Sequence, residues 1–488
     1  MQLLFSPVLL AVEQAVETSV LASGVKRSGL TFVLDRPAIR QGRPRDSSGT
    51  ARAWDSRVIG ASQRPRILAF AYSILPGAGS ERGSGWVWAR MLTGIGDTWV
   101  VTRPFPGRRE ILAKGLAGLP PNERPNMVYV DIPPWAQEVG RRHSPLFNRI
   151  EYVLWQVAAF RAARKMHAAN PFDIVWHLVY ANAWMGSLAA LVGPAFVYGP
   201  VGGGVHPPWR LVATLGLRGI MYELVRALAR WAGRNLNPVA AVSWRRAKLI
   251  LVQNRETREW LPEAERHKAH VFPNAVLDEM VGRAPAMRTG RTRTALYAGR
   301  LLPLKGVSLA IDTIALLPDW QLVICGEGPD ERRLRERAQR RAPGRVTFLG
   351  WLPRVELLRL MREDAGVFLF PSLHDEGCWT AAEAGALGLP VVCLDLGGPP
   401  LLASAAVTPG TPRETVMRLA AAVQAAPPPP RIATEMRIGP RRAHLRELLT
   451  AADLLPGAVT TPGSPGTDGG MGTQASPPCP PPGDSERP

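Results

Sequence analysis

The sequence predicts an α/β protein with two doubly wound parallel sheets that face a central cleft. Three observations predict this fold class. Short apolar runs bounded by turn residues recur along the chain, amphipathic stretches separate several of them, and one polar segment divides them into two series. Uninterrupted apolar runs are typical of strands that helices bury on both faces. Strands that alternate with helices indicate parallel sheets.

Composition agrees with a folded chain of two or three domains. The chain has 488 residues, of which 46% are hydrophobic and 20% are charged, and this excludes a largely disordered or fibrous protein. Four cysteines lie far apart, with no C-x-x-C pair and no histidine at metal-ligand spacing: Cys325, Cys378, Cys393 and Cys479. Their placement excludes a disulfide scaffold and a zinc site, and fits a reducing cytosol.

The strands of the first series are expected in seven runs: RILAFAY, TWVVTR, NMVYVDI, DIVWHLV, AFVYGP, LILVQN and HVFPN. Within this series, residues 174–209 lack Asp, Glu, Lys and Arg. Their glycines and prolines divide them into strands over 174–178 and 195–198 with a helix over 182–192, so we expect no transmembrane helix.

The second series predicts five strands: TALYAGR, WQLVICG, RVTFLG, GVFLFPS and PVVCLDL. Helices are expected between them, over residues 307–317, 330–341, 354–362 and 380–388. In a doubly wound sheet, ligands bind outside the carboxyl ends of the strands. We therefore expect the site residues at the carboxyl ends of the predicted strands.

Composition shifts set the expected boundaries. Residues 1–63 show no sustained period and form a poorly ordered leader, and residues 456–488 form a disordered tail rich in Pro, Gly, Ser and Thr. The polar stretch 281–294 is the linker between the two Rossmann-like domains. The first domain spans 64–280, and the second spans 295–455 and ends in a short helix.

The chain is strongly basic, since 59 Lys+Arg minus 40 Asp+Glu gives a formal net charge of +19. Residues 61–280 carry most of the excess, with 27 basic and 15 acidic residues. A basic surface favours anionic partners such as nucleic acid, phospholipid headgroups or phosphorylated substrates. No zinc-finger, RNP or KH signature is present, so nucleic acid is not expected. A solvated basic face is the alternative interpretation.

Two cations of the second half form a candidate phosphate site. Arg300 follows a strand, and Lys305 precedes the next helix. A cation at a helix N-terminus opposes the helix dipole, but becomes favourable if a phosphate is bound there. The alternative is two solvated side chains. Further on, Gly326 and Gly328 form a Gly-x-Gly turn that allows close approach of a nucleotide, or simply a tight turn.

Two carboxylates flank a glycine-containing loop and a helix start. Asp375 and Glu383 stand eight residues apart, and such a pair can address opposite ends of a bound nucleotide sugar. The alternative concerns Glu383, because Thr380 and Glu383 have the spacing of a capping box that stabilises a helix without any ligand.

The first half adds a glycine-rich turn and a histidine. Gly83 and Gly85 follow the first strand, where backbone N–H groups can cradle phosphate or sugar hydroxyls. Their spacing matches neither a Walker A motif nor a dinucleotide fingerprint, which argues against ATP and NAD. His177 ends a strand, where cleft residues are expected, although a lone histidine there is more often structural.

Residues 209–246 are helical and basic, with seven arginines and three tryptophans. Arginine and tryptophan on an amphipathic helix suit the surface of an anionic bilayer. We therefore expect peripheral membrane docking, with ordinary packing helices and solvated arginines as the alternative.

Six segments occur in order over about 100 residues of the second half: GRLLPLKG, GEGPD, RVTFLGWLP, PSLHD, EAGALGLPVV and DLGGPP. Their order resembles the donor half of family 4 glycosyltransferases, which are retaining enzymes of the GT-B fold. The turn GSERGSGW after the first strand resembles a turn of some members. The family motif E-x7-E has Asp375 in its first position here and Glu383 in its second.

The resemblance implies a role for each candidate residue. Arg300 and Lys305 would hold the diphosphate of a nucleoside-diphosphate sugar, and Glu383 the ribose. Asp375 would face the transferred sugar together with the backbone of Gly377, Cys378 and Trp379, and His177 would contact the same sugar. Gly83, Gly85 and Gly326 would complete the donor site, and residues 64–280 would bind the acceptor.

The expected function is thus retaining transfer of a sugar to an acceptor hydroxyl, without a metal or other cofactor. The acceptor is expected to be a polyprenyl-diphosphate-linked sugar or another glycan of cell-envelope or exopolysaccharide synthesis. The enzyme is expected in the cytoplasm, at the inner face of the membrane. The alternatives are a GT-B nucleotide-sugar epimerase and a non-catalytic nucleotide-sugar-binding scaffold.

Overall fold

The computed structural model describes residues 64–133, 136–137, 145–180, 182–282, 292–425, 427–430 and 435–456. The expected leader over residues 1–63 lies outside the described residues. So do residues 283–291 of the expected linker and residues 457–488 of the expected tail.

The first sheet has seven parallel strands in the order β3-β2-β1-β4-β5-β6-β7. Side chains alternate between its faces, so that Ile67 and Ala69 pack on one layer and Leu68 and Phe70 on the other. All four are fully buried, as the apolar runs predict. The strands are β1 (Arg66–Ala71), β2 (Asp97–Thr102), β3 (Asn126–Tyr129), β4 (Ile174–Val179), β5 (Phe196–Val201), β6 (Ala247–Val252) and β7 (Ala269–Val271).

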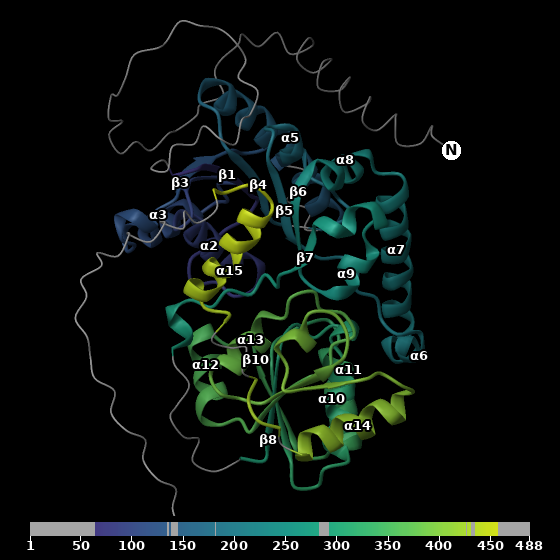
Figure 1. The fold of residues 1–488 in the computed structure, drawn as a ribbon. Helices are drawn as coiled ribbons and strands as arrows, with labels where there is room; N and C mark the ends of the chain where they lie inside the picture. Colours follow the sequence, from purple (N-terminus) through teal and green to yellow (C-terminus); the bar gives the residue numbers. More distant parts are fainter. Residues whose placement is uncertain are drawn as a thin grey trace, which may run out of the picture.

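Helices cover both faces of this sheet (Figure 1). The long helix α5 packs its Tyr152 and Trp155 against the layer that contains Phe70. The helices are α2 (Ser80–Thr93), α3 (Arg108–Ala117), α5 (Pro145–Ala169), α6 (Trp209–Val212), α7 (Gly216–Asn235), α8 (Pro238–Arg246) and α9 (Arg255–Trp260).

The second sheet has six parallel strands in the order β10-β9-β8-β11-β12-β13. The strands are β8 (Thr294–Ala298), β9 (Gln321–Cys325), β10 (Val346–Gly350), β11 (Val367–Phe370), β12 (Val391–Leu394) and β13 (Ala405–Val407). The helices are α10 (Val307–Ala315), α11 (Glu331–Arg341), α12 (Arg354–Glu363), α13 (Trp379–Ala386), α14 (Pro412–Ala425) and α15 (Ile438–Ala451).

The two sheets share one strand order, which confirms the predicted fold of two doubly wound domains. In each sheet the order changes direction beside the first strand, between β1 and β4 and between β8 and β11. Crevices outside the carboxyl ends at such points are where doubly wound sheets bind ligands.

The helix expected over residues 182–192 is wrong. Only a short 3-10 turn forms there, at Leu188–Leu191. Gly186 adopts a left-handed φ of 72°, and a Cβ atom at this position would lie 2.5 Å from the backbone nitrogen of Ala240. Close packing against α8 therefore sets a left-handed conformation that interrupts any helix. The edge strand β13 was not among the expected strands.

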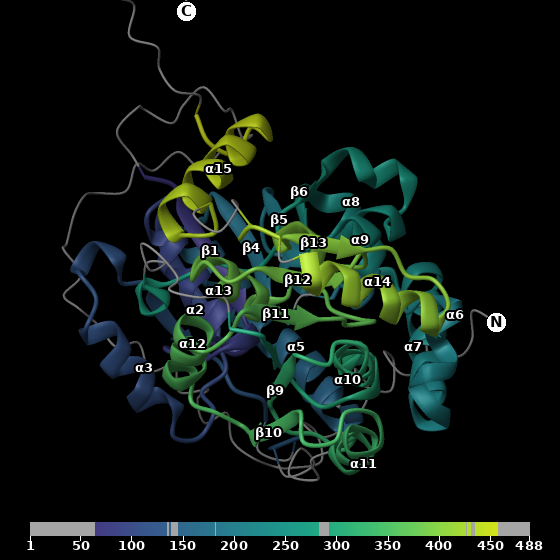
Figure 2. The ribbon, with the colours of Figure 1, turned by 90° about the horizontal axis from the view of Figure 1, so that it is seen from below.

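The short helix expected before residue 455 is α15, and it lies beside α2 of the first domain (Figures 1 and 2). The Arg446 guanidinium donates to the carbonyl oxygen of Gly94 at 2.8 Å, and Leu277 N donates to Met436 O at 2.8 Å. Helix α15 thus returns across the domain boundary.

Three of the four cysteines are described, and Cys325, Cys378 and Cys393 are all free and buried. Cys479 lies outside the described residues. Among the helices of the described ranges, none combines the length and the apolar character needed to cross a membrane.

Candidate active site between the two domains

A pocket of about 560 Å³ lies between the two domains. Its walls come from loops at the carboxyl ends of strands in both sheets, including Tyr180 after β4, Gly202 after β5, Arg300 after β8 and Asp375 after β11. The pocket thus lies at the direction change of both strand orders, where the fold predicts a ligand.

Lys305 and Asp375 form an ion pair inside this pocket. The Lys305 ammonium lies 2.6 Å from Asp375 Oδ2 and donates to the carbonyl oxygen of His374 at 3.2 Å. The second carboxylate oxygen of Asp375 accepts from the backbone N–H of Cys378 at 2.9 Å. The loop before α13 therefore holds both the Lys305 ammonium and the Asp375 carboxylate.

Four other predicted residues line the same pocket: Arg300, Gly377, Cys378 and Trp379. Arg300 is exposed at the end of β8. Cys378 has a positive φ of 36°, which is uncommon for a residue with a side chain. A Cβ atom at Gly377 would overlap Asn274 Oδ1 of the other domain, so a larger residue here would have to displace the Asn274 side chain.

Glu383 does not lie where the sequence prediction puts it. Its carboxylate is 2% exposed and is not among the groups that line the pocket. Oε1 accepts from Arg354 Nε at 2.6 Å and from Trp379 Nε1 at 3.0 Å. Burial raises the pKa of Glu383, and the positive charge of Arg354 opposes that increase. In this structure, the Glu383 carboxylate links Trp379 in the first turn of α13 to Arg354 at the start of α12.

The capping box considered for Thr380 and Glu383 is also absent. Helix α13 begins at Trp379, and its N-cap residue Cys378 makes no side-chain capping bond. The Glu383 carboxylate is used by Arg354 and Trp379 instead.

His177 does not line the pocket either. It is 1% exposed, and its ring nitrogens lie 2.8 Å from Ser187 Oγ and 3.2 Å from the Tyr152 hydroxyl. Burial lowers the pKa of His177 to about 3, so the ring is neutral at physiological pH. Because β4 continues past His177 to Val179, the side chains that reach the pocket come later, at Tyr180 and Asn182.

The three remaining glycines serve packing rather than the pocket wall. Gly83 and Gly85 lie inside α2, which begins at Ser80, so the expected open glycine-rich turn is wrong. A Cβ atom at Gly83 would overlap the carbonyl oxygen of Ala78, and one at Gly85 would lie 2.7 Å from Ile74 Cγ2. At Gly326, with φ of 137°, a Cβ atom would overlap the carbonyl oxygen of Gly299. None of the three lines the pocket.

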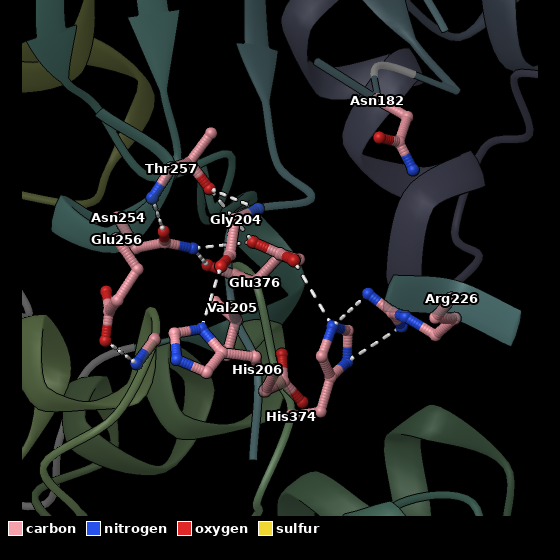
Figure 3. Close-up of polar contacts among 12 residues, drawn as sticks. Asn182, Gly204, Val205, His206, Arg226, Asn254, Glu256, Thr257, His374 and Glu376 are labelled. Atoms are coloured by element: carbon pink, nitrogen blue, oxygen red, sulfur yellow. Dashed lines mark hydrogen bonds and ion pairs between the residues drawn. The ribbon is translucent and has the colours of Figure 1, made fainter. Parts of the chain in front are cut away.

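Glu376 has no role among the sequence predictions, but in the structure its carboxylate joins the two domains. Asn254 caps α9 by accepting from Thr257 N at 2.8 Å, and this fixes its amide nitrogen toward the second domain. That nitrogen donates to Glu376 Oε2 at 2.7 Å, and Thr257 Oγ1 lies 3.3 Å from the same oxygen (Figure 3). The Glu376 carboxylate of the second domain is thus held by the first.

The charge of Glu376 is stabilised there. Burial alone would raise its pKa, but His374 lies 3.3 Å from Oε1, and Asn254 and the backbone of Gly203 donate hydrogen bonds. Together they lower the pKa of Glu376 to about 2. The Arg226 guanidinium of α7 contacts the other side of the His374 ring, with Nη1 3.4 Å from Nδ1 (Figure 3).

The first domain contributes further wall residues that the sequence reasoning missed. Glu81 of α2 accepts from the backbone N–H of Tyr180, which has a positive φ of 60°. Arg149 lies over the ring of Trp184, 5.4 Å from its centroid. All four line the pocket, so this wall is largely aromatic and carries one acid and one cation. Tyr180 directly follows β4, and Glu81 lies in the turn GSERGSGW, so the sequence carried a signal for these two. Arg149 and Trp184 belong to no motif.

Residues 285–424 match the family described as Glycosyl transferases group 1. The match spans β8 to α14, and so includes Arg300, Lys305, Asp375 and Glu383.

Several characterised proteins are similar in sequence. The 2-deoxystreptamine glucosyltransferase of Streptomyces kanamyceticus is 26% identical over 316 residues, which cover 60% of this chain and 77% of that protein. The GDP-mannose-dependent alpha-mannosyltransferase of Mycolicibacterium smegmatis is 39% identical over 103 residues, or 21% of this chain and 26% of that one. The D-inositol 3-phosphate glycosyltransferase of Mycolicibacterium vanbaalenii is 32% identical over 140 residues, or 25% and 31%.

Solved structures show the same fold at low identity. The lipopolysaccharide outer core galactosyltransferase WaaB in its apo form aligns with a TM-score of 0.50 at 14% identity, over 79% of this chain and 99% of that one. The N-terminal domain of Candida albicans trehalose-6-phosphate phosphatase aligns with a TM-score of 0.51 at 14% identity, over 79% and 97%. The chain therefore has a two-domain GT-B fold, and residues 285–424 within it match the glycosyl transferases group 1 family, which supports glycosyltransferase activity.

Proposed function

We propose that this chain is a retaining family 4 glycosyltransferase that moves a sugar from a nucleoside-diphosphate sugar to an acceptor hydroxyl. One observation carries the proposal. Arg300, Lys305 and Asp375 line the same interdomain pocket, within the segment that matches the group 1 family. A paired cation beside a second, exposed cation is suited to a diphosphate leaving group.

Lys305 has room for such a ligand. An ammonium group has three N–H donors, and Asp375 and the carbonyl oxygen of His374 take two of them. The third can donate to a phosphate oxygen without breaking the pair with Asp375. Negative charge grows on the diphosphate as the glycosidic bond breaks, and Arg300 and Lys305 would stabilise it electrostatically. The proposed reaction therefore needs no metal ion.

Asp375 is proposed to position the loop before α13 rather than to attack the sugar. Its two oxygens are already bound by Lys305 and by Cys378 N, so its charge is neutralised on the side of the cation. We favour a front-face route, in which the acceptor hydroxyl approaches on the side of the departing diphosphate and transfers its proton to a diphosphate oxygen.

Glu383 can reach a ribose only after Arg354 releases it. Arg354 already binds both oxygens of Asp278, at 2.9 and 3.0 Å, and can keep that pair while Glu383 turns toward the donor. We propose this exchange as part of donor binding.

The acceptor is proposed to be a lipid-linked sugar or a growing polysaccharide of cell-envelope or exopolysaccharide synthesis, used on the cytoplasmic side of the membrane. The aromatic and cationic wall of the first domain, with Arg149 and Trp184, suits an anionic glycan carrier. The names of the similar proteins also include small hydroxylated acceptors, 2-deoxystreptamine and D-inositol 3-phosphate.

Donor screening followed by product analysis tests the proposal. UDP-, GDP- and ADP-sugars are first compared for thermal stabilisation, because a ligand of the folded state raises the unfolding temperature. The stabilising donor is then incubated with polyprenyl-diphosphate-linked sugars and small cyclitols, and NMR reads the anomeric configuration of the product. Retention supports the proposal. A configuration change at the donor sugar alone would identify an epimerase, and binding without turnover of any acceptor would identify a scaffold.

A further inference from the structure

Helix α7 has its polarity reversed. Ordinary surface helices turn an apolar stripe toward the core and charged residues toward solvent. In α7, large apolar side chains face solvent, with Leu217 77% exposed, Leu228 65% exposed and Leu224 58% exposed. The exposed apolar residues of the helix are Leu217, Met221, Tyr222, Leu224, Val225, Leu228 and Trp231.

The opposite face of α7 is polar or small, and it is the face that contacts the protein. Glu223 is buried and lies within 4 Å of Arg226 and Arg230. The three are spaced by three and four residues, so they share one face. On the same side, a Cβ atom at Gly233 would lie 2.5 Å from Trp184 Cβ. The helix thus turns Glu223, Arg226 and Arg230 inward and exposes its leucines.

The position of α7 leaves this apolar face open. Figures 1 and 2 both draw α7 at the outer edge of the molecule. Just before it, Trp209 of α6 is 79% exposed. The face is therefore a continuous apolar surface extended by an exposed tryptophan, larger than the scattered apolar residues of an ordinary surface.

The sequence around this face carries charge of mostly one sign, although the exposed Glu414 of α14 lies near Arg210. Residues 209–246 contain seven arginines and one acid, Glu223, and that acid is buried. Exposed cations surround the helix without an exposed acid in this stretch: Arg210, Arg234, Arg245 and Arg246. Any partner that binds the apolar face of α7 must therefore tolerate or neutralise the positive charge of these arginines.

We infer that the outer face of α7, with Trp209, docks the enzyme on an anionic lipid bilayer. Leucine and tryptophan would enter the boundary between headgroups and acyl chains, while the arginines contact the phosphates of the lipids. A second copy of the chain would suit the apolar stripe, but would bring two sets of unpaired arginines together. Charge complementarity therefore favours the bilayer.

Docking through α7 would bring the pocket close to the membrane. Arg226 lies on the inner face of the helix and lines the pocket. A helix with its side chains is about 10–12 Å across, so headgroups under the outer face would lie about one helix diameter from Arg226. If the proposed function holds, a lipid-linked acceptor would reach the pocket directly from the bilayer. Only this consequence of the docking inference rests on the proposed function.

Vesicle flotation tests membrane docking through α7. Because flotation requires neither donor nor turnover, a negative result would not bear on the proposed glycosyltransferase activity. The full-length chain is mixed with vesicles of phosphatidylcholine with or without phosphatidylglycerol. We expect flotation with the anionic vesicles and little with pure phosphatidylcholine. The L224D/L228D variant changes two exposed positions, so it should fold normally and bind the anionic vesicles at least about tenfold more weakly.

The matched control is M417D/A421D on α14 of the second domain, which adds the same two charges at exposed helical positions. It should float like the wild type. The inference is overturned if the wild-type chain fails to float with anionic vesicles at low salt, or if both double variants lose binding equally. It is also overturned if light scattering without lipid shows an oligomer that L224D/L228D dissociates, since α7 would then join two copies.

Discussion

The two domains share a strand order but build the pocket in different ways. In the second domain, Arg300, Lys305 and Asp375 reach the pocket as the sequence predicts, whereas Glu383 and Gly326 do not. In the first domain, none of the predicted residues Gly83, Gly85 and His177 reaches the pocket, and Tyr180, Asn182 and other residues form the wall instead. A shared topology therefore locates a site at the strand ends, but it does not determine which side chains enter it.

The difference has a local cause. After β8 and β11, the predicted side chains lie in the loops over residues 299–306 and 371–378, and these loops line the pocket. The loop after β1, over residues 72–79, is equally long, but Gly83 and Gly85 lie beyond it inside α2, where they allow close packing. Strand β4 continues past His177 to Val179, so the His177 ring is buried in the core and does not reach the pocket. Gly83, Gly85 and His177 of the first domain therefore serve packing, although the sequence patterns predict that they bind a ligand.

The largest effect is expected in the second domain, from Lys305→Ala. Removing one donor to a group that develops negative charge costs about 10²- to 10³-fold in kcat. Steady-state rates with the stabilising donor measure this loss, and Lys248→Ala, an exposed lysine of the first domain, serves as the control. Rates within twofold of the wild type in K305A would remove Lys305 from the site.

The contact between the domains should weaken at low pH through Glu376. Its folded-state pKa of about 2 lies below its ordinary value of 4.5. Its ionised form therefore adds stability above pH 4.5, about 3 kcal/mol, which is lost as the pH falls toward 2. Unfolding free energies between pH 6 and 2.5 should fall more steeply for the wild type than for Glu376→Gln. Parallel curves for the two proteins would show that Glu376 does not carry this dependence.

The packing role of the glycines in the first domain predicts a smaller loss. Gly83→Ala should destabilise the fold by about 1–3 kcal/mol, because its methyl group overlaps the carbonyl oxygen of Ala78. Gly79→Ala should cost less, at most about 1 kcal/mol, because nothing lies within 4 Å of its Cβ position and the loss comes only from the weaker N-cap that alanine gives α2. Urea unfolding compares the two. A G83A variant as stable as G79A, with weaker donor binding, would restore the phosphate-cradle interpretation.

The smallest effect on catalysis is expected from His177→Asn. A group whose pKa is about 3 is neutral from pH 5 to 8, so its replacement should leave the pH profile of kcat unchanged and lower kcat by less than about threefold. Loss of its buried hydrogen bonds should reduce stability by about 1–2 kcal/mol. A hundredfold fall in kcat at unchanged stability would instead place His177 in the active site.

Most strands could be predicted from the sequence because burial on both faces leaves a local signature, as in the run over β4. The prediction of a helix over 182–192 was wrong because Gly186 packs against α8, which lies about fifty residues further along the chain. Glu376 was missed as an organising residue for a similar reason, since its partners Asn254 and Thr257 belong to the other domain. Local patterns predict elements and strand-end side chains, whereas contacts between domains require the fold.

The most direct test is a crystal structure of the chain with the nucleoside diphosphate of its stabilising donor. The account predicts the diphosphate in the interdomain pocket, with one phosphate oxygen within hydrogen-bonding distance of Lys305 Nζ and a second facing Arg300. A diphosphate bound elsewhere, or one in the pocket that neither cation contacts, would contradict the account.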